Sequence, residues 1–181
     1  MELLLKTDPN CINVLDAVGA SALIFAAEKG HAKIVKVLLD YGSDPNFATT
    51  DHHKTALHQA ALGGFLDVVE LLLDSRAESD PLDDNNCSPL WWAAMYGYHK
   101  LVKILLERNA NPNVSSTPAM RRPIHLAAHN GHTEVVKLLL EAGAEPDEED
   151  AEDVTPLWLP LKKVIMKSLS YCLELERQIL K

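Results

Sequence analysis

The chain has 181 residues, 47% of them hydrophobic, and a formal net charge of −9 at pH 7. That charge argues against non-specific nucleic-acid binding, which needs lysine and arginine to displace counterions from phosphate. No apolar run approaches the length of a membrane span, and the N-terminus shows no signal-peptide pattern. Three widely separated cysteines, Cys11, Cys87 and Cys172, indicate free thiols in a reducing compartment, so we expect an intracellular protein, cytoplasmic or, as an alternative, nuclear.

The first clear element is a pair of short helices between Ser21 and Gly42. Ser21 is a suitable N-cap, Ala26 and Ala27 give the first helix a small face, and Gly30 can end it in a left-handed conformation. The second helix has aliphatic residues at helical spacing, Ile34, Val35, Leu38 and Leu39. The small face of the first helix lets a neighbouring helix approach closely.

The same unit recurs along the chain at a nearly constant period. Its starts are separated by 34, 33 and 34 residues and stand at Ser21, Thr55, Ser88 and Arg122. Nine residues after each start stands a glycine, namely Gly30, Gly64, Gly97 and Gly131. Repetition of this kind predicts a stacked array in which each unit packs only against its neighbours.

Three motifs of these units, Thr55-Ala56-Leu57-His58, Gly30-His31 and the exit Gly42-Ser43-Asp44-Pro45-Asn46, resemble the ankyrin repeat. The resemblance implies an all-α solenoid of stacked helix-turn-helix units, which we expect to form one domain over residues 1–181. We assign four full repeats, 16–47, 50–80, 83–113 and 117–147. Some positions depart from the pattern: Arg76 and Asn109 replace the exit glycine, Asp80 the exit asparagine, and Arg122 the capping Ser or Thr.

Partial units are expected at both ends. Residues 1–15 fit the end of a repeat, which either continues a longer array or forms a short N-terminal cap. Residues 153–181 begin a fifth repeat, but Pro160 would break its first helix, and the spacing beyond it predicts one amphipathic helix that caps the array or docks on a partner. The acidic run 145–153 between them is expected to be a solvated loop.

We find no catalytic motif and expect neither enzymatic activity nor a cofactor. His125, His129 and His132 have helical or turn spacing, but no acidic or thiol ligand accompanies them, so we expect no zinc site. The resemblance instead implies that histidines of the start motif and of the Gly-His step make hydrogen bonds between turns.

The resemblance places a binding surface on the concave side, where first helices and inter-repeat turns are exposed. Trp92 and Tyr96 are four residues apart on one helix, with Met95 and Tyr98 close by, and such groups are common binding hot spots. Packing between repeats is the alternative role for these side chains, and it is the role that we expect for Trp91. Arg121 and Arg122 are expected on one flank, and the remaining surface residues are expected to be Leu62, His129, Asn130, Lys54 and Asp51.

The sequence therefore predicts a monomeric module that binds a protein or peptide, with no nucleic acid, membrane or small-molecule substrate. One alternative is a ubiquitin-ligase adaptor, for which the tail offers a Leu169-Ser170-Tyr171-Cys172 step, one residue shorter than cullin-recruiting boxes have. A second is a targeting module in a larger, possibly enzymatic, protein. By resemblance, Asn46 and Asn113 also match asparagines that intracellular hydroxylases modify.

Overall fold

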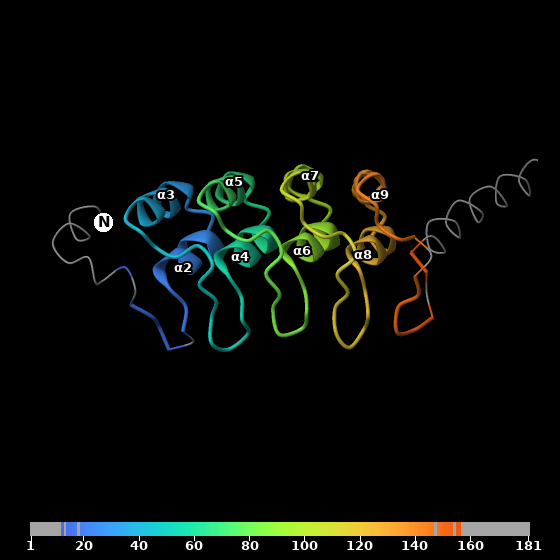
Figure 1. Ribbon diagram of the computed structural model, residues 1–181, viewed down its shortest axis with the longest axis horizontal. Coiled ribbons are helices and arrows are strands. Elements are labelled where there is room, and N and C mark those ends of the chain that lie inside the picture. The colour runs from blue at the N-terminus through green and yellow to red at the C-terminus, as the bar shows by residue number, and fades with distance from the viewer. Residues whose placement is uncertain (1–11, 13, 18, 147, 154, 157–181) are drawn as a thin grey trace, which may run out of the picture.

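The computed structural model describes residues 12, 14–17, 19–146, 148–153 and 155–156. Its described helices lie in two rows (Figure 1). The inner row is α2 (Ala22–Glu28), α4 (Ala56–Gly63), α6 (Pro89–Tyr96) and α8 (Pro123–His129), and the outer row is α3 (Ala32–Asp40), α5 (Leu66–Asp74), α7 (His99–Glu107) and α9 (Thr133–Glu141). The loops that join successive pairs, residues 43–55, 77–88 and 110–122, project from the inner row and are called fingers below. The expected C-terminal helix and most of the N-terminal partial repeat fall outside the described residues.

The inner helices begin where the sequence places their caps. The side chains of Ser21, Thr55 and Ser88 accept the backbone N–H three residues on, at 3.4, 3.4 and 3.2 Å. At Arg122, where no hydroxyl is present, the His125 N–H donates to the Arg122 carbonyl oxygen at 3.0 Å. The His125 ring accepts the Arg122 N–H at 3.2 Å, as the His58 ring accepts the Thr55 N–H at 3.1 Å. Each inner helix therefore starts at a fixed residue, which fixes the finger before it.

Close packing of the inner row depends on its alanines. Each inner helix contacts the next one along the row, and each also contacts the outer helix of its own pair. The side chains at these contacts are small and fully buried, as at Ala27, Ala60, Ala61, Ala93, Ala94 and Ala127. The leucines and valines of the outer helices complete one continuous core along the array.

The exit turns after the outer helices keep the same backbone whether or not they contain glycine. Gly42 and Gly143 have φ values of 89° and 84°, and Arg76 and Asn109 have 67° and 64°. Of the two possibilities for Arg76, left-handed strain or a different turn, the structure shows the left-handed conformation. The position of the next finger is thereby preserved.

A ladder of side-chain hydrogen bonds joins the start motifs of the second, third and fourth repeats to the loop that follows each repeat. His58 Nε2 bonds the Cys87 carbonyl oxygen at 3.0 Å, and His125 Nε2 bonds the Glu148 carbonyl oxygen at 2.9 Å. In the third repeat Trp91 replaces the histidine, and its Nε1 donates to the Arg121 carbonyl oxygen at 2.9 Å. The indole N–H thus serves the same purpose as the two imidazoles.

A second ladder joins consecutive exit turns. The Asn46 amide accepts the Glu78 N–H at 2.8 Å and donates to the Arg76 carbonyl oxygen at 3.4 Å. Asn113 makes the equivalent bonds to Glu145 and Gly143, at 3.0 and 3.1 Å.

Asp80 stands at this position between the other two. Its Oδ2 accepts the Asn111 N–H at 2.5 Å, but its Oδ1 is buried with no hydrogen-bond partner among the described residues. Burial raises the pKa of Asp80, because it removes water from the charged carboxylate and only the Asn111 N–H opposes this effect.

We predict that acid weakens the first ladder. Burial lowers the pKa of both His58 and His125, because it removes water from the charged form of the ring. Each Nδ1 also accepts a backbone N–H, so the folded state holds both rings neutral. The unfolded chain therefore takes up protons first, and the free energy of unfolding should fall as the pH decreases below about 6.5. Denaturant titrations between pH 8 and 5 test this, with His58→Gln expected to reduce the slope. Ring titration of both histidines at an ordinary pKa, followed by NMR, would contradict it.

We also predict that Asp80→Asn raises the free energy of unfolding by about 1 kcal/mol at pH 7, since the amide can satisfy both neighbouring groups. In the wild type the raised pKa means that the folded state holds the proton more tightly, so lowering the pH through that pKa should relieve the same penalty. Asn46→Asp is the reciprocal control and should be destabilising. Equal stability of wild type and Asp80→Asn at pH 7 would refute the assignment.

Candidate functional site

Trp92 lies on α6, half-buried, with one side of its ring packed against the core. The Trp91 ring meets it edge-on at a centroid distance of 4.9 Å. The Lys54 ammonium, which comes from the finger of residues 43–55, lies 5.0 Å from the Trp92 ring centroid in a cation–π arrangement. The Trp92 side chain therefore packs between repeats and is also partly exposed at the surface. Lys54 lies beside it and belongs to the same site.

Tyr96 is the most exposed aromatic of this group, with 45% of its surface accessible. Its ring stacks on Tyr98 at a centroid distance of 5.9 Å. Tyr98 itself packs over Gly64, where a Cβ atom would lie 2.7 Å from the tyrosine Cζ. Tyr98 thus fills the packing position between repeats and supports Tyr96 from behind.

The polar neighbours come from the fourth repeat. The Met95 carbonyl oxygen accepts hydrogen bonds from Asn130 Nδ2 at 3.0 Å and from the His132 ring at 3.1 Å. His129 and Asn130 are exposed, and Met95 is half-buried. Leu62, half-buried on α4, stands one repeat before Met95 in the same register.

The two arginines form ion pairs with the acidic run, which the sequence predicts to be a solvated loop. Arg121 pairs with Asp150 at 3.0 Å and with Glu152 at 3.2 Å, and the Asp150 side chain is almost wholly buried. Arg122 pairs with Glu145 and with Glu148. The paired side chains of Glu145, Glu148 and Glu152 stay 57%, 55% and 73% exposed, so most of the run remains in contact with water, and the buried Asp150 attaches it to the finger of residues 110–122.

Asp51 lies at the exposed tip of the first finger, residues 43–55. A hydrogen bond from the Thr49 hydroxyl lowers the pKa of its carboxyl group. His52 lies 3.8 Å from Asp51, and His53 bonds Asp84 of the next finger at 2.6 Å. The described ranges hold no group of three or more His, Cys, Asp or Glu side chains arranged for a metal ion.

Phe25 was not predicted as a surface residue, yet 43% of it is exposed. It occupies on α2 the position that Trp92 has on α6, whereas Leu126 at the same position of α8 is buried. The period alone could have identified it, since residues at equivalent positions face the same side. The inner row therefore presents apolar side chains at more than one repeat. Asn46 and Asn113, by contrast, have their amides engaged between exit turns.

Comparison with known proteins gives the family. The model for ankyrin repeats (3 copies) matches residues 1–83, 42–116 and 77–150. Serine/threonine-protein kinase 12 of Arabidopsis thaliana is 42% identical over 87 residues, 48% of this chain and 19% of the kinase. E3 ubiquitin-protein ligase KEG of the same plant is 31% identical over 108 residues, 57% of this chain and 7% of the ligase. Ankyrin repeat and KH domain-containing protein mask-1 of Caenorhabditis elegans is 37% identical over 126 residues, 62% of this chain and 5% of that protein.

The chain thus spans less than a fifth of the length of each of these relatives. None of the helices in the described part is long and apolar enough to cross a bilayer. The family model covers most of the chain, and the stacked helix pairs have the all-α solenoid architecture that the sequence predicts. This chain belongs to the ankyrin repeat family, whose repeats are protein-interaction modules with a non-catalytic fold.

Proposed function

We propose that this chain binds a protein or peptide along the surface formed by the inner helices and the fingers, and that it catalyses no reaction itself. The observation that carries the proposal is the cluster on α6, where an exposed Tyr96 and a half-buried Trp92 stand beside Met95. Aromatic and methionine side chains in such a setting supply most of the binding energy in many interfaces.

The cluster is held ready for a partner. Tyr98 stacks behind Tyr96, and Lys54 lies over the Trp92 ring, so neither aromatic has to be ordered when a partner arrives. Preorganisation of this kind reduces the entropy lost on binding. Leu62, His129, Asn130 and Asp51 would form the surroundings of the bound segment, and Arg121 would act through its ion pairs rather than as a free cation.

We infer an intracellular and monomeric protein that needs no cofactor. The described thiol, Cys87, is free and buried, and burial raises its pKa to about 12, so it is suited neither to nucleophilic chemistry nor to metal binding. Such a cysteine is ordinary in a reducing compartment.

A second proposal is that the array targets a larger protein to its partners. It is supported by relatives that are named as a kinase and as a ubiquitin ligase and that are much longer than this chain. The adaptor alternative depends on Leu169 to Cys172, which lie outside the described residues. A transcript that continues past either end into a catalytic domain would favour the targeting role.

We predict that the double variant Trp92→Gln/Tyr96→Lys loses its partner. Gln59 in the second repeat stands at the position equivalent to Trp92, and Lys29 in the first repeat at the position equivalent to Tyr96. The fold should therefore tolerate glutamine and lysine at these two positions. Affinity capture from cell extract with mass spectrometry would identify the partner, and its Kd should rise at least about tenfold in the variant.

The matched control is Leu140→Ala. Leu140 is 40% exposed on the outer helix α9, so the substitution removes a similar apolar surface from the outer row of helices. The affinity of the Leu140→Ala variant for the partner should stay at the wild-type value. Unchanged partner binding by a folded Trp92→Gln/Tyr96→Lys variant would place the site elsewhere.

A further inference from the structure

The lysines and arginines on the side of the inner helices and fingers already have partners within the chain. Lys29 pairs with the glutamate before it, and Lys54 lies over the Trp92 ring. Arg121 and Arg122 form ion pairs with the acidic run. The inner helices with their caps, the three fingers and residues 145–153 contain no other lysine or arginine. The described part of this surface therefore has no free cation to offer a partner.

Several carboxylates of the same surface lack such a partner. The side chains of Asp51 and Asp84 are 39% and 45% exposed, and their ion-pair contacts are with His52 and His53, whose rings are positive only when protonated. Glu149 and Asp153, by contrast with the paired members of the acidic run, are exposed and form no salt bridge with a described residue. The surface thus carries negative charge that the chain itself does not compensate.

Asp51 and Asp84 lie beside the aromatic cluster on α6. Asp51 stands three residues before Lys54, whose ammonium reaches Trp92, and Asp84 belongs to the second finger, residues 77–88, which leads into α6. The first two fingers run side by side (Figure 1), and the Asp84 N–H donates to the His52 carbonyl oxygen at 3.2 Å. Both carboxylates are therefore held at the finger end of α6, where the exposed apolar surface begins.

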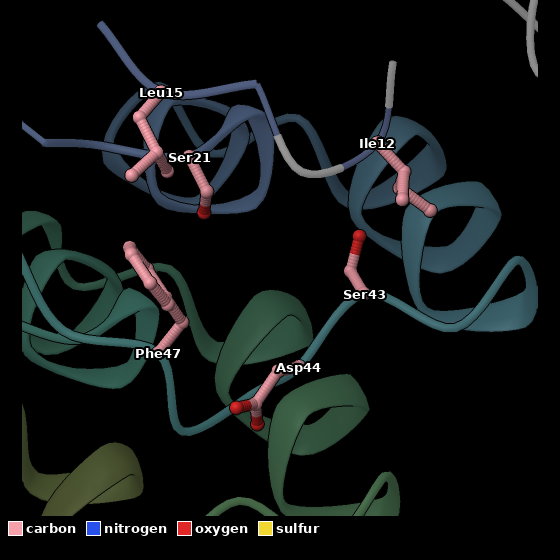
Figure 2. Close-up of a pocket in the computed structure, with 6 residues that line it drawn as sticks. All are labelled: Ile12, Leu15, Ser21, Ser43, Asp44 and Phe47. Atoms are coloured by element: carbon pink, nitrogen blue, oxygen red, sulfur yellow. The ribbon is translucent and has the colours of Figure 1, made fainter. Parts of the chain in front are cut away.

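The negative charge continues toward the first repeat. A cavity at the first junction of the array is lined by Ile12, Leu15, Ser21, Ser43, Asp44 and Phe47 (Figure 2). Asp44 is the charged member of this set, and it is exposed at the base of the first finger, with Oδ1 accepting the Asn46 N–H at 2.9 Å. A segment that extends from α6 along the fingers toward the first repeat would thus meet further negative charge.

We propose that the partner of the α6 cluster is a basic protein segment. An apolar side chain of this segment packs on Trp92 and Tyr96, and lysine or arginine side chains next to it pair with Asp51 and Asp84. The inference rests on the proposed function, because it takes the α6 cluster as the anchor. Exposed ion pairs are individually weak, so the apolar contact supplies most of the affinity while the carboxylates select the segment and its register. An acidic segment would be repelled, since no free cation receives it.

The first experiment selects peptides from a random display library on the full chain. Selected peptides are then tested against Trp92→Gln/Tyr96→Asn, which introduces Gln59 of the second repeat and Asn130 of the fourth at the equivalent positions and leaves the charge unchanged. Peptides that lose binding in this folded variant bind at the α6 cluster. We expect them to be rich in lysine and arginine around one large apolar residue.

The second experiment measures the Kd of those peptides for Asp51→Asn/Asp84→Asn. We expect the Kd to rise about fivefold, as two exposed ion pairs can supply, and its dependence on salt concentration to become weaker. The matched control is Glu70→Gln/Glu141→Gln, which removes the same charge from exposed positions on the outer helices α5 and α9. The control should bind as the wild type does, since its carboxylates lie in the other row.

The outcomes separate this inference from the proposed function. Peptides that depend on Trp92 and Tyr96 but are acidic or uncharged would leave the α6 cluster as the binding site and overturn the basic partner. An equal Kd for Asp51→Asn/Asp84→Asn and for its control would also overturn it. If every selected peptide bound the folded Trp92→Gln/Tyr96→Asn variant normally, the proposed site itself would be wrong, and this inference would fall with it.

Discussion

The hydrogen bond from a start-motif ring to the carbonyl of the next finger is the contact on which the array depends. It recurs at His58, Trp91 and His125, with donor–acceptor distances between 2.9 and 3.0 Å. Each bond joins a ring in one repeat to a backbone carbonyl oxygen of the next loop, and the Cys87 and Arg121 oxygens accept a backbone N–H as well, from Asp83 and Ser116. The bond thereby links neighbouring units directly. Because an array has no central core, such nearest-neighbour contacts must supply its cohesion.

The same constraint decides where function can reside. Positions that contact a neighbouring repeat are committed to packing, as Tyr98 is over Gly64 and Phe65 is over Gly30. The positions that remain are those on the open side of the inner row, and there the side chains differ from repeat to repeat. Trp92 and Tyr96 occupy two of these positions, and this is the physical reason why they are better candidates for recognition than Trp91.

Most of the helices and turns could be predicted because every repeat carries the same sequence signals for them. Caps, glycines and alanine pairs at a constant period indicate the helices, and the structure has them at those places. The acidic run that we predicted to be solvated is exposed at Glu145, Glu148 and Glu152, but its Asp150 side chain is buried. Sequence separation hides that Asp150 faces Arg121, because the fold superimposes residues that are about one repeat apart. The cavity beside Ser43 was likewise not predicted, since its walls come from three separate segments of the chain.

The sequence by itself determined the type of element, the period and therefore the family, since these depend on local propensities and on spacing along the chain. It also identified α6 as the unit whose surface differs most from the rest. Tertiary structure alone decided what each side chain meets: Lys54 over the Trp92 ring, Tyr98 behind Tyr96, and a hydroxyl without a partner at Ser43. These contacts join different repeats, and their geometry depends on how tightly neighbouring units stack, which no single repeat encodes.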